Sequence, residues 1–195
     1  MIANFPKYKY LLTYRYAEII HDLSVEFCQK NLSHLSYLGH LRNLPTRRTI
    51  DQMVQAARSG KQNIVEGVEF SQTSKKGEIK LLGVAKASFS ELLTDYEDFL
   101  RQHNLQIYPK THPKVTEFRQ TAYRLSHLSN LSDIGRLKEK PVLPKDPAEA
   151  ANFLLTLCHL ETYLLDRQIK AMENRFIQEG GFTENLFKKR LQVKI

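Results

Sequence analysis

Apolar residues recur three or four positions apart along most of the chain, which is the spacing of one face of an α-helix. Between residues 10 and 32 this stripe consists of Leu12, Tyr16, Ile19, Ile20, Leu23 and Phe27. A second stripe follows Thr46, a residue type that caps helices, and consists of Ile50, Met53, Val54, Ala57, Ile64 and Val68. Gly60 lies within it, where it lowers helix propensity and lets another backbone come close. Residues 33–45 lose the period, so we expect a connection there.

Two further helices are expected in the middle of the chain. Ser74 ends a polar break and is expected to cap a third helix, whose apolar stripe is Ile79, Leu82, Ala85, Phe89, Leu92, Tyr96 and Phe99. A shorter helix is expected after Pro113, with an inward face of Val115, Phe118, Ala122 and Leu125. Residues 128–145 have no period and are rich in basic residues, so we expect a long basic crossover loop, ordered or partly disordered.

The last predicted helix has the clearest start signal in the sequence. Asp146 provides a cap, Pro147 occupies the first helical position and Glu149 the third. No glycine or proline interrupts the chain from there to Glu179, and two glycines follow as a stop signal. The apolar residues of this helix cover more than one stripe. We therefore expect it to be buried on two sides, either by its own bundle or by the bundle and another subunit.

With no alternating strand pattern of useful length, the sequence predicts an all-α fold. We expect an up-and-down antiparallel four-helix bundle with an additional short helix. The length of 195 residues, 42% hydrophobic and 26% charged, is typical of one globular domain, residues 1–195. Residues 182–195 are expected to form a basic C-terminal tail.

Cysteine content and hydropathy indicate the compartment. Two cysteines, Cys28 and Cys158, in a chain with no signal-peptide pattern favour the reducing cytoplasm, and we expect both to be small buried hydrophobic side chains. No stretch approaches 18 uninterrupted apolar residues, so neither a membrane span nor a membrane partner is expected.

Several fragments occur in an order that resembles one known family. They are residues 52–57 (QMVQAA), Ser59, residues 63–67 (NIVEG), Ser74-Lys75-Lys76, Ala85, Ser88, Glu91, Leu92, residues 163–168 (YLLDRQ) and residues 173–182 (ENRFIQEGGF). Over roughly residues 10–190 the chain resembles the four-helix-bundle proteins encoded in intervening sequences of 23S ribosomal RNA, in their "four helix bundle suffix" branch. Lys61 departs from this pattern, because the family usually carries a proline there, and a bend at that point is less expected.

The resemblance implies a homo-oligomer. Relatives look like pentameric rings with a basic surface, and one is an accessory protein of diversity-generating retroelements that binds nucleic acid and a reverse transcriptase. By this resemblance we expect a pentamer whose partners are the backbone of RNA or DNA and a nucleic-acid-processing protein. Most members of the family have no assigned activity.

The chain carries a net charge of +8, and the basic excess is spread along it. In a ring of several copies these fields add, and a polyanion would release counterions at each phosphate contact. The sequence lacks an RNA-recognition motif, a zinc finger and a helix-turn-helix signature, so we expect non-specific binding of nucleic acid. The candidate contacts are Arg47, Arg48, Arg58, Lys61, Lys75, Lys76 and Lys80.

A protein-interaction scaffold without nucleic-acid binding is the alternative hypothesis. In it the basic residues only keep the protein in solution. Under both hypotheses, another chain covers the surplus apolar residues of the last helix. The predicted interface residues are Leu154, Leu160, Tyr163 and Phe176.

One polar cluster is a candidate for chemistry. Asn63 and Glu66 share a helix face, and Glu91 is expected on the neighbouring helix. Facing carboxylates could serve as acid and base or hold a metal ion. A hydrogen-bonded pair that fixes helix register is the favoured interpretation, because no nucleophile accompanies the cluster.

Enzyme motifs are otherwise weak. Glu18 and His21 form one Glu-x-x-His, where a di-metal bundle needs two, and Arg15 with His21 loosely matches the spacing in helical HEPN ribonucleases. The sequence has no phosphate loop, nucleophile elbow or Cys-x-x-Cys. We therefore predict no enzymatic activity, no metal and no cofactor, with a ribonuclease or metal enzyme as a distant third hypothesis.

Overall fold

The computed structural model describes residues 5–32, 47–127 and 141–193, and these residues form helices and connections without a strand. The helices are α1 (Leu12–Phe27), α3 (Arg47–Phe70), α4 (Lys75–Gln102), α5 (Pro113–Ser126), α6 (Pro147–Glu179) and α7 (Phe182–Val193). A short 3₁₀ turn, η1 (Lys7–Tyr10), precedes α1, and a π-helical turn, η2 (Cys28–Leu32), continues it. The predicted all-α class is confirmed.

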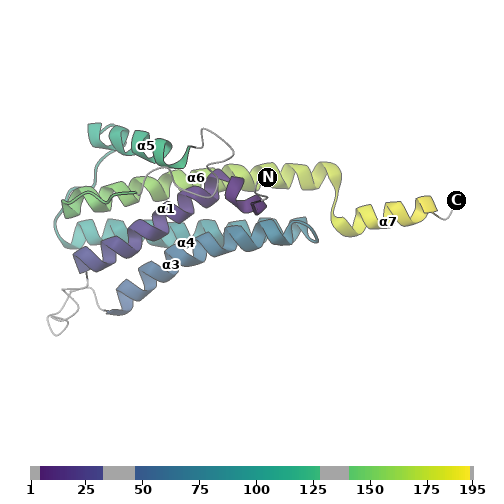
Figure 1. Ribbon diagram of the computed structural model, residues 1–195, viewed down its shortest axis with the longest axis horizontal. Coiled ribbons are helices and arrows are strands. Elements are labelled where there is room, and N and C mark those ends of the chain that lie inside the picture. Colours follow the sequence, from purple (N-terminus) through teal and green to yellow (C-terminus); the bar gives the residue numbers. More distant parts are fainter. Residues whose placement is uncertain (1–4, 33–46, 128–140, 194–195) are drawn as a thin grey trace.

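Five of these helices pack together in the described part of the chain. α3 lies between α1 and α4, α6 contacts both α4 and α1, and α5 packs on α6 (Figure 1). The expected connection at residues 33–45 and most of the crossover loop, residues 128–140, lie outside the described residues. At residues 182–195 the prediction of a mere tail was incomplete, because α7 forms there and projects beyond the packed helices (Figure 1).

The predicted helix signals are in place where the structure describes them. The Gly77 amide donates a hydrogen bond of 3.0 Å to the Ser74 hydroxyl at the start of α4. The Glu149 amide donates one of 2.8 Å to the Asp146 carboxylate at the start of α6. α6 ends at Gly180, whose positive φ of 71° suits a residue without a Cβ.

A cluster of aromatic side chains joins α1 to α4 in the core. Phe27 of α1 contacts Tyr96 and Phe99 of α4 edge-on, with ring centroids 5.3 and 5.0 Å apart. The buried Tyr96 hydroxyl donates to Ser24, 2.8 Å away, and the Ser24 hydroxyl donates to the Ile20 carbonyl oxygen. This chain of bonds ties α4 to α1 without leaving a buried hydroxyl unpaired.

Gly60 sets how closely α3 and α4 pack. A Cβ on Gly60 would lie 2.6 Å from the ring of Phe89, which is completely buried. The close neighbour is therefore an aromatic side chain of α4, rather than a backbone as the sequence suggested. Gly83 of α4 has no atom within 4 Å of the corresponding point.

We predict opposite effects for alanine at these two glycines. Gly60→Ala should lower the free energy of unfolding by about 1–3 kcal/mol, because a buried ring must move. Gly83→Ala, the matched control, should raise it by about 0.5–1 kcal/mol through helix propensity alone. Urea denaturation followed by circular dichroism measures both, and equal effects of the two variants would contradict this account.

Candidate functional site

The seven predicted cations do not form one patch. Arg47 and Arg48 begin α3, whereas Lys75, Lys76 and Lys80 lie in the first turns of α4. The two helices run antiparallel, since Gly60 faces Phe89 while Gly67 faces Leu82. A 24-residue helix is ~36 Å long, so the two groups lie at opposite ends of α3, with Arg58 and Lys61 between them.

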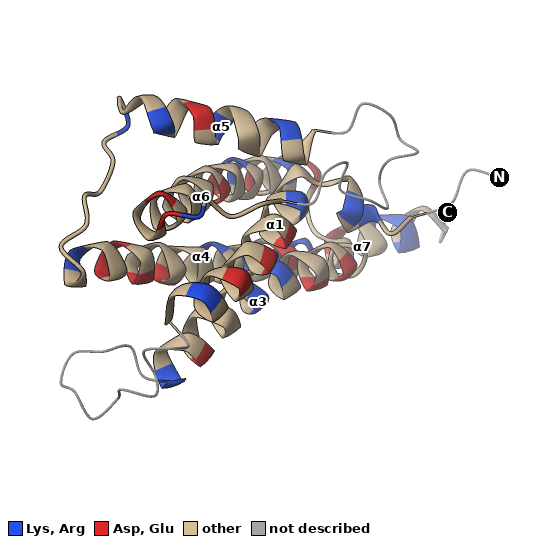
Figure 2. Ribbon diagram, turned by 60° about the vertical axis from the view of Figure 1, so that its left-hand side comes forward, with Lys and Arg blue, Asp and Glu red and all other residues tan. Residues whose placement is uncertain are grey.

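Five of these seven cations are free to meet a ligand. Arg47, Arg48, Arg58, Lys76 and Lys80 are exposed and form no ion pair among the described residues. Lys75 differs, because its ammonium group lies 2.7 Å from the Glu179 carboxylate. The Lys61 ammonium nitrogen lies 3.3 Å from Nδ1 of His21 and is half-buried. Along the helices basic and acidic residues are interspersed (Figure 2).

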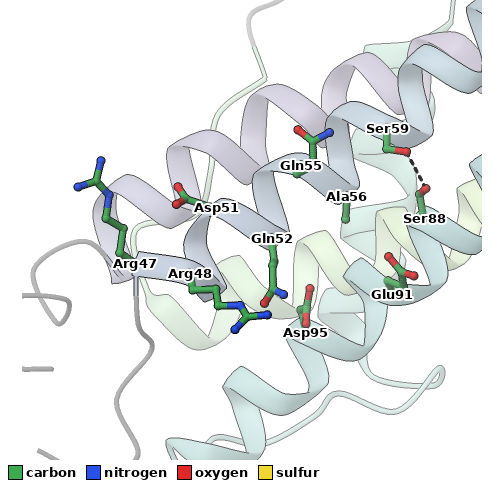
Figure 3. A pocket seen from close by; sticks show the side chains of 10 residues that line it. All are labelled: Arg47, Arg48, Asp51, Gln52, Gln55, Ala56, Ser59, Ser88, Glu91 and Asp95. Carbon is green, nitrogen blue, oxygen red and sulfur yellow. Dashed lines mark hydrogen bonds between the residues drawn. The ribbon is translucent and has the colours of Figure 1, made fainter.

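A groove of about 870 Å³ lies between the first half of α3 and the second half of α4 (Figure 3). Arg48, Gln52 and Asp95 point toward one another across it, while Arg47 points away (Figure 3). The groove is lined by Arg47, Arg48, Asp51, Gln52, Gln55, Ala56, Ser59, Ser88, Glu91 and Asp95. Because three carboxylates oppose two guanidinium groups, the groove itself is not a basic site.

Asp95 makes the charge of this groove depend on pH. Burial, reinforced by the nearby carboxylates of Asp98 and Glu91, raises the pKa of Asp95 to about 6. At neutral pH the carboxylate is ionised and faces the groove, so a phosphate is attracted to the arginines at the rim rather than to the interior. The acidic residues of this groove therefore interrupt the basic surface that α3 contributes.

The predicted cluster of Asn63, Glu66 and Glu91 is not assembled. The Asn63 amide donates to the carbonyl oxygen of Ser59 at 2.8 Å, Glu66 is exposed, and Glu91 lines the groove further along α4. The polar link between α3 and α4 is instead the 3.1 Å hydrogen bond from Ser88 to Ser59 (Figure 3). The described residues hold no group of three or more potential metal ligands.

Both cysteines are buried small side chains, as predicted. Cys28 is 1% exposed and Cys158 is completely buried, and neither forms a disulfide. Burial raises the pKa of the Cys28 thiol to about 12, so it stays protonated and unreactive at neutral pH.

The predicted interface on α6 needs correction. Leu154 cannot face a partner, because it is completely buried within the chain. All residues from 150 to 158 are buried, and α5 supplies part of the cover through the contact of Phe118 with Phe153. The two-sided burial of this half of α6 is therefore achieved inside one chain.

Of the other predicted interface residues, Tyr163 is 58% exposed, whereas Leu160 and Phe176 are half-buried. A larger exposed apolar surface lies at the end of α6 and along α7, which the sequence analysis missed. It consists of Ile177, Phe182, Leu186, Phe187 and Leu191. We call these five residues the C-terminal apolar arm.

Glu161 is the most unusual group in the core. Its side chain is completely buried on α6, and neither carboxyl oxygen has a hydrogen-bond partner in the described structure. Burial raises the pKa of Glu161 well above its ordinary range. The ionised form of Glu161 is therefore disfavoured in the folded protein.

Comparisons with protein-family models, curated proteins and solved structures give no match for this chain. The resemblance to the intervening-sequence family thus rests on the quoted fragments alone. Within the described residues, no helix is both long and apolar enough to cross a membrane.

We predict that Glu161→Gln stabilises the protein increasingly as pH rises. The unfolded chain ionises Glu161 above about pH 4.3, whereas the folded chain keeps it protonated, so rising pH favours unfolding of the unsubstituted protein. The gap between the two proteins should widen by up to about 1.4 kcal/mol per pH unit above that point.

Chemical denaturation at pH 5 and pH 8 measures this gap. The control is Glu66→Gln, which removes an exposed carboxylate of α3 and should change stability by no more than about 0.5 kcal/mol at either pH. A gap for Glu161→Gln that stays constant with pH would show that Glu161 is ionised in the folded protein.

Proposed function

We propose that this chain is a non-enzymatic helical scaffold that assembles with copies of itself and binds nucleic acid non-specifically. In this proposal α1, α3, α4 and α6 form an up-and-down antiparallel four-helix bundle, and the copies form a ring, as the family resemblance implies. The net charge of +8 per chain then adds over the assembly.

One observation carries the nucleic-acid part of the proposal. Arg47, Arg48, Arg58, Lys76 and Lys80 are exposed and form no ion pair with the described carboxylates, so a phosphate need not displace an existing partner. Other lysines are by contrast paired with acidic residues: Lys86 and Lys170 with Asp166, and Lys114 with Glu149. Unpaired cations release counterions when phosphates bind them, which favours salt-sensitive binding without base recognition.

A protein-interaction scaffold is the second candidate, supported by the C-terminal apolar arm. Its five residues are 46% to 78% exposed. An apolar surface of this kind on a projecting helix is typical of a site that another chain covers. The same arm supports self-assembly under the first proposal.

We predict that Arg47→Gln, Arg48→Gln and Arg58→Gln, combined, weaken binding of a fluorescent RNA or DNA duplex. Each lost phosphate contact should reduce the slope of log K against log salt by ~0.9. The control combines Lys86→Gln, Lys114→Gln and Lys170→Gln, which remove the same charge from lysines paired with Asp166 and Glu149. Fluorescence anisotropy over a salt series measures both triple variants.

The arginine variants should lose markedly more affinity than the lysine control, although their net charge is the same. Equal losses would mean that overall charge, and no particular surface, attracts the duplex. If the unsubstituted protein does not bind at about 50 mM salt while its assembly is intact, the nucleic-acid proposal is wrong and the scaffold hypothesis remains.

We also predict that Leu186→Ser with Phe187→Ser lowers the mass of the assembly. These residues are 46% and 61% exposed on α7, and serine removes the apolar surface that another copy would cover. Lys188→Ser with Lys189→Ser is the control on the same helix, and it should leave the mass unchanged. Light scattering on nuclease-treated protein gives the masses. A single-chain mass for the unsubstituted protein would refute self-assembly.

A further inference from the structure

A second cavity, of about 330 Å³, is lined by residues of α6, α5, the end of α4 and the connection from α4 to α5, and by none of the seven predicted cations. Its volume is at the lower end of the range for small-molecule sites. Its charged, aromatic and exposed lining residues include Glu97 of α4, Ile107 and Lys110 of the connection, Arg119 of α5, and His159 and Tyr163 of α6.

Asn152 fixes the wall of this cavity. This side chain of α6 is 2% exposed, and its amide oxygen accepts a 2.7 Å hydrogen bond from the Tyr108 amide. Its amide nitrogen donates to the Gln106 carbonyl oxygen at 2.9 Å. The connection that carries Ile107 and Lys110 is thereby attached to α6, so the cavity is formed before any ligand arrives.

The electrostatics of the cavity favour an anion. Lys110 and Arg119 form no ion pair with a described residue, although Lys114, between them in sequence, is paired with Glu149 at 3.3 Å. Burial lowers the pKa of His159; Glu97 opposes this shift, and Lys110 and Arg119 add to it. Two fixed positive charges and one negative charge thus surround a neutral imidazole.

The mouth of the cavity adds apolar and aromatic surface. Ile107 is 45% and Tyr163 58% exposed, while Val115 and Leu155 form a buried floor. Exposed aromatic rings beside unpaired cations are the combination that holds a nucleotide, with the base stacked on the ring and the phosphate on the cations. A simple inorganic anion would use only half of these features.

We propose that this cavity binds a nucleoside phosphate, with the phosphate between Lys110 and Arg119 and the base against Tyr163. The ligand is either a free nucleotide or an unpaired nucleotide within a strand. The site uses none of the seven predicted cations of α3 and α4. It therefore goes beyond the proposed function, and its test is independent of the test of that function.

The test uses adenosine monophosphate, adenosine and inorganic phosphate as probes, with titration calorimetry and NMR of the histidine rings. Adenosine monophosphate should bind at least tenfold more tightly than either other probe, because only it engages both halves of the site. A bound phosphate should raise the pKa of His159, since it adds negative charge near the ring. Equal affinity for adenosine monophosphate and inorganic phosphate would overturn the proposal.

Variants assign the two halves of the site. Lys110→Gln with Arg119→Gln should weaken binding of adenosine monophosphate by on the order of tenfold or more. Tyr163→Ala should weaken adenosine monophosphate but not phosphate, and the paired Lys114→Gln serves as control. Binding that survives the loss of Lys110 and Arg119 would refute the site. All variants change exposed or half-buried side chains, and thermal melting checks their folding.

Competition then identifies the source of the nucleotide. Displacement of adenosine monophosphate by a single-stranded oligonucleotide, but not by a duplex, supports an unpaired nucleotide within a strand. Retention of adenosine monophosphate in the presence of the oligonucleotide supports a free nucleotide.

Discussion

The contact between Gly60 and the ring of Phe89 determines how α3 and α4 pack. The positions of the two groups of cations, at the start of α3 and at the start of α4, depend on this packing. The absence of a Cβ allows a buried aromatic ring to approach the backbone of α3. One residue away, the hydroxyls of Ser59 and Ser88 are hydrogen-bonded. This register places Arg48 opposite Asp95, and it places the Lys75 end of α4 beside the C-terminal end of α3.

Charge pairing divides the basic residues into two populations. Carboxylates form ion pairs with Lys75, Lys86, Lys114 and Lys170. Asp166 accepts hydrogen bonds from two of these lysines, Lys170 and Lys86, and these bonds lower the pKa of Asp166 to about 2. The arginines of α3 have no such partner among the carboxylates that the structure describes. A net charge of +8 therefore says less about binding than the positions of the cations that remain unpaired.

α6 combines a structural and a binding role at different points along its length. Residues 150–158 are buried, and α1, α4 and α5 pack against the helix. Beyond residue 158 the helix keeps one unpaired acid in the core, Glu161, and presents His159 and Tyr163 toward the second cavity. Its far end and α7 expose the C-terminal apolar arm. The apolar content of the sequence does not distinguish these regions, because the packing of other helices decides which apolar side chains of α6 are buried.

The sequence by itself indicated α1, α3, α4, α5 and α6 but not α7, and it gave the starts of α4 and α6, because the 3.6-residue period and the caps at Ser74 and Asp146 act within a few residues of one another. It also identified both cysteines as buried, since each lies on an apolar helix face. Only the tertiary structure decided that Leu154 is internal, that the basic residues separate into two ends, and that Asp95 opposes Arg48. These properties depend on which helix faces which, and residues far apart in the sequence, such as Gly60 and Phe89 or Phe118 and Phe153, set them by direct contact.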